Sequence, residues 1–180
     1  MVIIIAGAAV VFLVLWVISC RHRLVIMDEN INDAMVQVGV QISSRFDVLT
    51  MLLYLTKEYA AHEAHTLIGT IKSRRSAITA TSTPDDVLEQ EEIIAETLDR
   101  ISMVAERYPD LKANENYAKY MNAVDSYERM VNTSRLIYND SVAKLNRELW
   151  TFPTFLIAKV FGFRKREYLE AVEEKGRYPA

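Results

Sequence analysis

Residues 114–149 contain one apolar stripe that keeps a seven-residue register for five repeats: Tyr117, Val124, Val131, Tyr138 and Leu145. A seven-residue repeat hardly drifts around a helix, so partner helices must cover the stripe along its whole length. The pattern therefore predicts one long helix at the centre of a helical bundle, with every other segment arranged as its cover.

The same stripe has a second row with the same seven-residue spacing, and two of its positions are charged: Met121, Glu128, Arg135, Val142 and Leu149. The interior of a bundle tolerates a charged side chain only when that side chain is paired and hydrogen-bonded. We therefore expect each of them to pair with a neighbouring helix or to lie at the edge of the seam, in water. Asn139 and Asn146 are also seven residues apart, and we expect these polar groups to fix the register rather than to bind a ligand.

The composition favours helices and excludes several kinds of function. The 180 residues include only 5 glycines and 4 prolines, and 51% of the residues are hydrophobic, which is enough for a buried core. A net charge of −3 with scattered basic residues gives no field for nucleic acid. The single cysteine, Cys20, cannot form an internal disulfide, so packing must hold the fold.

Residues 2–20 predict a single-pass membrane anchor, since residues 2–18 contain no charge and no proline. Arg21 and Arg23 follow directly, and the positive-inside rule then places the N-terminus outside and the bulk of the protein in the cytoplasm. We assign residues 1–20 to the anchor and residues 21–180 to a helical-bundle domain.

A second interpretation of this segment reverses the topology. Val17-Ile18-Ser19-Cys20 resembles a bacterial lipoprotein signal, in which a small residue precedes a lipidated cysteine, and the protein is then exported to the periplasm. No basic residue precedes the apolar run, as a secretory signal needs, and Arg21 and Arg23 stand where export disfavours them. The flanking charges favour the retained anchor.

Start and stop signals divide the rest of the chain. A stripe without proline predicts a first helix over residues 24–80, either a straight stalk leaving the membrane, which we favour, or a helix kinked near Gly69. The motif Thr83-Pro84-Asp85-Asp86 starts a second helix over residues 84–107, and Pro109 ends it. A third helix covers residues 114–150, and the tail is residues 154–180. The sequence thus predicts an all-α protein: an N-terminal transmembrane helix, then an antiparallel up-and-down bundle of three long helices plus a short C-terminal helix.

Several motifs resemble the signature of the LemA family: residues 108–117, residues 135–139, Phe152-Pro153 and Phe161-Gly162-Phe163. The resemblance implies an N-terminal anchor, a helical up-and-down bundle and a role at a bacterial membrane, here the inner membrane, and it implies no agreed activity. Thr50-Met51 stands where the family usually has Pro-Asn, which leaves the first helix free to run straight. The residues to which we assign motif or structural roles are Tyr108, Pro109, Leu111, Lys112, Asn114, Glu128, Arg135, Tyr138, Asn139, Phe152 and Pro153.

One group of residues suggests a metal site. Glu58, His62 and His65 share a helix face at spacings of four and three, which suits two histidines and one carboxylate. The zinc-protease pattern fails, because the residue four positions after His62 is Thr66. A metal here would suggest an accessory of a membrane enzyme, whereas we favour a solvated face. No nucleophile stands beside a base elsewhere, so the sequence predicts neither catalysis nor a cofactor.

The tail is apolar and aromatic. Residues 155–161 are followed by Arg164-Lys165-Arg166, a pattern typical of a membrane-interface segment. If the three long helices run out, back and out again, however, the tail lies at the far end of the bundle, away from its own bilayer. We therefore expect it to pack as a fourth helix, to contact a neighbouring subunit or to touch a second membrane, in that order.

Aromatic rings in the tail favour self-association. Four rings within twelve residues give more apolar surface than one face of a short helix need bury, and they belong to Phe152, Phe155, Phe161 and Phe163. Of these, Phe155, Phe161 and Phe163 are the expected interface. The corner at Tyr108, Lys112 and Asn114 is a second candidate surface, since loops often carry recognition. The sequence therefore predicts a membrane-anchored homo-oligomer that acts in assembly, with a protein partner that it does not identify.

Overall fold

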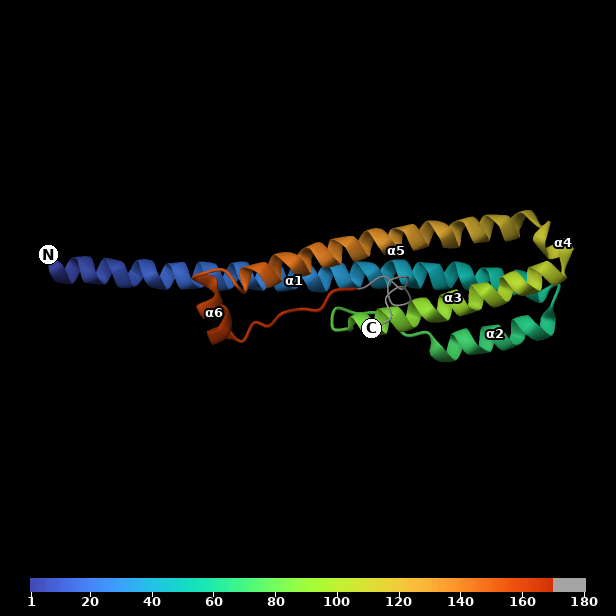
Figure 1. Cartoon of the computed structure of the whole chain (residues 1–180), viewed down its shortest axis with the longest axis horizontal. Helices are drawn as coiled ribbons and strands as arrows, with labels where there is room; N and C mark the ends of the chain where they lie inside the picture. The colour runs from blue at the N-terminus through green and yellow to red at the C-terminus, as the bar shows by residue number, and fades with distance from the viewer. Residues whose placement is uncertain (170–180) are drawn as a thin grey trace, which may run out of the picture.

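The computed structural model describes residues 1–169, except for the side chain of Val2, so residues 170–180 of the predicted tail lie outside the described residues. The described residues form no strand, and their helices are α1 (Val2–Lys57), α2 (Ala61–Arg74), α3 (Pro84–Arg107), α4 (Pro109–Lys112), α5 (Glu115–Glu148) and α6 (Thr154–Phe161). Figure 1 shows an elongated bundle from which the first part of α1 projects alone. The predicted all-α bundle with a long N-terminal helix is confirmed.

Helix α1 carries two different surfaces along one uninterrupted rod. Its first turns are apolar and exposed, with Ile3 at 86% and Phe12 at 72%. Among the described residues, α1 is the one helix long and apolar enough to cross a membrane. From Leu24 onward one face is buried, through Ile31, Met35, Val38, Ile42, Phe46, Leu49 and Leu53. Because no proline interrupts it, the membrane-length segment and the core face belong to the same straight helix.

Helix α5 covers the buried face of α1 along the length of the bundle (Figure 1). Val124, Val131 and Leu145 of the seven-residue register are fully buried, and Tyr138 is 3% exposed. Tyr117 is half-buried and packs against the same core. The apolar register of residues 114–149 therefore forms the seam between α5 and α1.

The helix predicted over residues 24–80 is two helices, because the chain reverses at residues 58–60. The last turn of α1 tightens there, with the amide of Tyr59 donating to the carbonyl of Thr56 at 3.1 Å. Ala60 then leaves helical angles, with φ −139° and ψ 71°. The alternative, a kink near Gly69, is also absent, since α2 continues through that residue.

Tertiary contacts, rather than a glycine or a proline, hold this reversal in place. The hydroxyl of Tyr59 accepts a hydrogen bond from the side-chain amide of Asn114 at 3.1 Å. Ala60 is 3% exposed and belongs to a second, smaller core together with Val104, Ala105 and Leu111. The end of α1 is thus fixed by the corner that joins α3 to α5.

Helix α3 begins at the residue that the sequence predicts and also anchors the end of α2. The hydroxyl of Thr83 accepts from the amide of Asp86, and the carboxylate of Asp86 accepts from the amide of Thr83, forming a capping box. These hydrogen bonds, the one to the backbone foremost, lower the pKa of Asp86 below its ordinary value. The helix spans Pro84–Arg107, as predicted.

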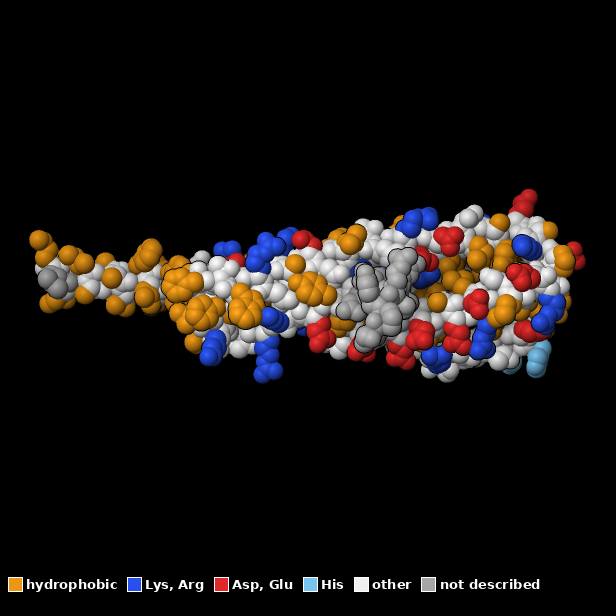
Figure 2. Space-filling model, in the orientation of Figure 1, with side chains coloured by type: hydrophobic (Ala, Val, Ile, Leu, Met, Phe, Trp, Pro, Cys, Tyr) orange, Lys and Arg blue, Asp and Glu red, His pale blue; other side chains and the backbone are white. Residues whose placement is uncertain are grey.

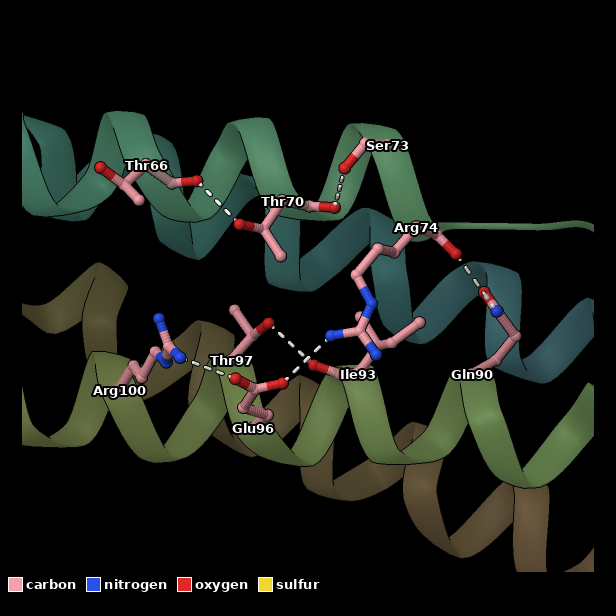
Figure 3. Close-up of polar contacts among 9 residues, drawn as sticks. All are labelled: Thr66, Thr70, Ser73, Arg74, Gln90, Ile93, Glu96, Thr97 and Arg100. Atoms are coloured by element: carbon pink, nitrogen blue, oxygen red, sulfur yellow. Dashed lines mark hydrogen bonds and ion pairs between the residues drawn. The ribbon is translucent and has the colours of Figure 1, made fainter.

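A buried glutamine joins α2 to α3 (Figure 3). The amide nitrogen of Gln90 donates to the carbonyl of Arg74 at 3.3 Å. Its oxygen accepts from the backbone amide of Ser76 at 2.8 Å. Figure 3 also shows Glu96 accepting from Arg74 at 3.2 Å and from Arg100 at 2.7 Å. Gln90 is 1% exposed, and its two bonds satisfy a carbonyl that the end of α2 leaves unpaired and an amide of the loop that follows.

The extra reversal changes the direction of every later helix. Helix α2 runs back along α1, α3 runs out again, and α5 returns toward the projecting part of α1 (Figure 1). The expectation that the tail lies at the far end of the bundle is therefore wrong. Helix α6 lies beside α1, near the end of its apolar exposed segment.

Gly39 permits the loop between α2 and α3 to cross α1. A Cβ at Gly39 would lie 2.6 Å from the carbonyl oxygen of Ile78 and 2.9 Å from the Cβ of Ile78. Gly69 gives a matched contrast, because a Cβ there would meet nothing within 4 Å. The close approach of the loop to α1 therefore requires glycine at residue 39, whereas residue 69 has room for a side chain.

We predict opposite effects of alanine at these two glycines. Gly39→Ala should destabilise the fold by about 1–3 kcal/mol, since the loop backbone must move. Gly69→Ala should stabilise it by about 0.5–1 kcal/mol through helix propensity. Thermal unfolding of the full-length protein in detergent, followed by circular dichroism, measures both. Equal melting temperatures for the two variants would contradict the close approach.

Candidate functional site

A cluster of charged side chains lies inside the bundle and joins α1, α3 and α5. Arg135 of α5 pairs with Glu91 of α3, and their side chains are 9% and 8% exposed. Glu128 of α5 accepts from Arg45 of α1 at 2.5 Å, with side-chain exposures of 50% and 8%. The two charged positions of the α5 register thus take their partners from two different helices.

The electrostatics of this cluster follow from its burial. Desolvation raises the pKa of Glu91 above its ordinary value, although the charges of Arg135 and Arg45 act in the opposite direction. The Nε atoms of both arginines are buried and have no hydrogen-bond partner among the described residues. Because each carboxylate of the cluster faces a guanidinium, neither is free to act as a base, and the arrangement suits a structural lock.

The corner before α5 is built for packing more than for display. Leu111 is fully buried in the smaller core. Asn114 caps α5, its side-chain oxygen accepting from the amide of Asn116 at 2.8 Å. Tyr108 is half-buried, while Pro109 and Lys112 are exposed. Of the residues predicted to form a binding corner, only Lys112 is therefore fully presented to a partner.

The geometry proposed for a metal site is wrong. Glu58 lies in the reversal after α1, whereas His62 and His65 belong to α2, so the three residues do not share one helix. All three side chains are exposed. Within residues 1–169 no group of three or more His, Cys, Asp or Glu side chains is arranged to hold a metal ion.

The aromatic tail segment contacts α1 where the exposed apolar part of that helix ends. The Sγ of Cys20 lies 3.6 Å from the Oγ1 of Thr154, at the start of α6. The guanidinium of Arg21 lies 5.4 Å from the ring centroid of Phe161. Nearby, Arg23 pairs with Glu148 at 3.2 Å. Helix α6 is thereby fixed beside residues 20–23 of α1.

The rings of this segment divide between core and surface. Phe152 is 76% exposed, Phe155 40% and Phe161 46%, whereas Phe163 is half-buried and packs against the main core. Pro153 directly precedes α6. Of the three phenylalanines expected at an interface, Phe155 and Phe161 are exposed enough to meet another molecule, and Phe163 contributes chiefly to the bundle.

After α6 the chain turns back along α5 and is held there by two asparagines. Gly162 ends the helix in the left-handed region with φ 76°. Asn146 donates to the carbonyl of Arg166 at 2.9 Å and accepts from its amide at 3.0 Å. Asn139 binds Leu169 in the same two-bond manner, at 2.9 Å and 2.8 Å. These asparagines therefore position a strap, residues 163–169, on the bundle.

Tyr138 also contributes to this strap. Its hydroxyl donates to the carbonyl of Glu167 at 3.1 Å, and burial raises the pKa of Tyr138 above its ordinary value. Arg166 pairs with Asp28 of α1 at 2.9 Å, so the strap is tied to both long helices. Tyr138 and Asn139, which the sequence placed in the bundle core, thus hold a segment of the same chain.

The sequence identified one side of each ion pair and missed the other. Glu91 stands between Val87 and Ile94 on the apolar face of α3, at steps of four and three, and this position was the available signal. Arg45 likewise follows Ile42 by three residues on the buried face of α1. A search of every helix for a charged residue inside an apolar stripe would have found both partners.

Comparison with known proteins agrees with the motifs. The model of the LemA family matches residues 34–180, which is most of the chain. The match includes the corner, both charged positions of α5 and the aromatic segment. No curated protein matches the chain.

We predict that removing one member of the buried pair is costly. Arg135→Leu leaves Glu91 buried without its partner and should destabilise the fold by about 3–5 kcal/mol near neutral pH. Since burial raises the pKa of Glu91, the cost is present while the carboxylate is ionised and should shrink as the pH falls through that raised pKa. Thermal unfolding at pH 7 and at mildly acidic pH measures both effects.

The double variant Glu91→Leu with Arg135→Leu is the control for that measurement. Replacing both charges by apolar groups leaves no buried charge without a partner, so the double variant should be more stable than Arg135→Leu alone. Arg107→Leu, which removes an exposed arginine from its pair with Glu63, should change stability little. A single variant as stable as the double variant would show that Glu91 finds other compensation.

Proposed function

Since this chain belongs to the LemA family, we propose that it is a single-pass membrane-anchored helical bundle that acts in assembly at a bacterial membrane and catalyses no reaction. The family is not a known enzyme family. The observation that carries the proposal is the continuity of α1, in which one helix supplies both the exposed apolar segment and the central face of the core. Such a helix holds the bundle on the membrane as a rigid projection.

The charges beside the apolar segment support a cytoplasmic bundle at the inner membrane. Arg21 and Arg23 follow the span directly and are exposed. Positive residues remain on the cytoplasmic side of a span, so the N-terminus lies outside in this proposal. Attachment through a lipid on Cys20, with the bundle in the periplasm, is the alternative that the same segment offers.

Self-association in the membrane plane is the second part of the proposal. A single-pass anchor confines the protein to two dimensions, which raises its local concentration and lets modest contacts sustain an oligomer. Exposed apolar side chains remain on the bundle away from α6, including Leu136 at 70% and Ile137 at 55%. Assembly of identical chains, rather than turnover of a substrate, is the role that these features favour.

The topology makes a direct prediction. Protease added to sealed spheroplasts should leave residues 24–180 intact, because the bundle lies on the cytoplasmic side. Permeabilised cells treated with the same protease are the control, and there the bundle should be digested. Digestion in sealed spheroplasts, or a lipid found on Cys20 by mass spectrometry, would assign the protein to the periplasmic side.

The oligomer is tested by mass. We predict that the full-length protein in mild detergent has a protein mass, by light scattering, of more than one chain over a wide concentration range. Crosslinking in native membranes before solubilisation should give a product with the same number of chains. A single-chain mass in both experiments would exclude self-association and leave the exposed Lys112 corner as the place to search for a different partner.

A further inference from the structure

We propose that α6 and the residues flanking it form a second membrane contact, in which exposed rings enter the headgroup region of the bilayer that α1 spans and exposed cations bind its anionic lipids. The inference rests on the anchor proposed above. The occupant of this surface is therefore a lipid, and the segment concerned is residues 150–165.

The height of α6 along α1 is the first argument. Residues 2–20 span about 28 Å as a helix, close to the roughly 30 Å of a bilayer's hydrocarbon core. Cys20 then lies at the boundary between hydrocarbon and headgroups. Because Thr154 is 3.6 Å from Cys20, the start of α6 lies at that same boundary.

The orientation of α6 is the second argument. Figure 1 shows α6 crossing the direction of α1 rather than following it. A helix that crosses the anchor lies along the membrane surface, as interfacial helices do. Its inner side packs on the bundle through Thr154, Ile157 and Ala158, which are buried.

The outer side of this segment is apolar and aromatic. Trp150 is 73% exposed, Phe152 76% and Val160 81%, with Phe155, Leu156 and Phe161 at 40% or more. Figure 2 shows hydrophobic side chains, several of them rings, gathered where the projecting part of α1 enters the bundle. Aromatic side chains are enriched at membrane interfaces because an apolar ring suits that boundary.

Cations surround these rings. Arg21, Lys159, Arg164 and Lys165 are all exposed, although the whole chain carries a net charge of −3. Two carboxylates of this region, Glu148 and Asp28, are already paired with Arg23 and Arg166. The exposed positive charges are available to lipid phosphates, because an anionic membrane surface attracts basic side chains near it.

A pocket between the end of α5 and α6 favours a lipid over a second copy of the chain. Its volume is about 490 Å³, and its lining residues include the aromatic Trp150, Phe155 and Phe163 together with the basic Lys159 and Lys165. Apolar walls beside exposed cations, one of which, Lys165, lies 4.5 Å from the ring centroid of Trp150, match an acyl chain beside a phosphate. The same surface of another copy would bring like charges together.

The two tryptophans of the chain allow a direct test with the full-length protein. Trp16 lies in the anchor and Trp150 beside α6. Trp16→Phe and Trp150→Phe each leave one reporter, and both proteins are reconstituted in vesicles of phosphatidylcholine and phosphatidylglycerol that carry a headgroup nitroxide. Trp150 emission should fall by about twofold or more, as expected for a ring at headgroup depth.

Each outcome assigns the failure to one proposal. Quenching of Trp150, with Trp16 quenched most by a nitroxide placed on the acyl chain, supports both. Quenching of Trp16 alone overturns the interfacial contact and retains the anchor, whereas Trp16 emission that no lipid nitroxide quenches overturns the anchor itself. A Trp150 that is quenched equally without phosphatidylglycerol shows that the cations do not bind anionic lipid, which overturns that part of the inference.

Two sets of substitutions complete the test in the Trp16→Phe protein. Phe155→Ser with Phe161→Ser should abolish the quenching of Trp150, whereas Met103→Ser with Met130→Ser, exposed methionines elsewhere on the bundle, should not change it. If the oligomer dissociates in the first variant and Trp150 is not quenched in the parent, the rings contact a second copy instead.

The charge-reversing variant Lys159→Glu with Arg164→Glu tests the cations. Both positions are exposed, so the fold should tolerate the change, and the quenching of Trp150 should no longer depend on phosphatidylglycerol. Quenching that still depends on phosphatidylglycerol would contradict the role of the cations.

Discussion

The packing of α5 along α1 is the interaction on which the rest of the structure depends. Helix α1 contacts α2, α3, α5 and α6, so every other long element is placed relative to it. Each fully buried Leu, Ile or Val in this seam contributes about 1.5–3 kcal/mol against the entropy of ordering the chain. Because the same helix continues as the exposed apolar segment, the core of the bundle and the proposed membrane anchor belong to one helix rather than to two joined parts.

An apolar register alone does not choose one alignment of two long helices. A shift of seven residues brings similar apolar side chains back into contact, at little cost in buried area. The pairs Arg45–Glu128 and Glu91–Arg135 remove this ambiguity, because a shifted register would leave a buried charge without a partner. The buried charges therefore serve specificity in the seam, while the apolar positions supply its stability.

The sequence predicts the parts of this fold that local residues determine and misses the parts that contacts between distant residues determine. Local chemistry marks the start of α3, where Thr83, Pro84 and Asp86 form a cap, and its end at Pro109, so those bounds were predicted to the residue. The reversal at residues 58–60 has no glycine or proline and is fixed by burial of Ala60 against a corner fifty residues later. No periodicity in one segment shows that contact, and a single missed reversal placed the tail at the wrong end of the bundle.

The candidate site divides in the same way. Arg135 and Glu128 stood out because they interrupt an apolar register, but the identity of a partner on another helix is a property of the tertiary fold. The sequence shows Asn139 and Asn146 as a polar pair. Their hydrogen-bond partners, the backbone groups of residues 169 and 166, reach them only because the chain returns along α5 after α6. Patterns along the chain thus locate unusual side chains, and the topology decides what they meet.

The geometry of the two asparagines explains why α6 is held rather than free. Each carboxamide offers one donor and one acceptor, which match the carbonyl and amide of a single residue. Two helical turns separate Asn139 from Asn146 by about 10.5 Å, and three extended residues cover about 10 Å, so the strap fits in one register. Bound at Thr154 on one side and at Arg166 on the other, α6 takes its position from the bundle before any lipid is present. The membrane contact that we propose therefore begins from rings that are already ordered, so that little further conformational entropy is lost on contact.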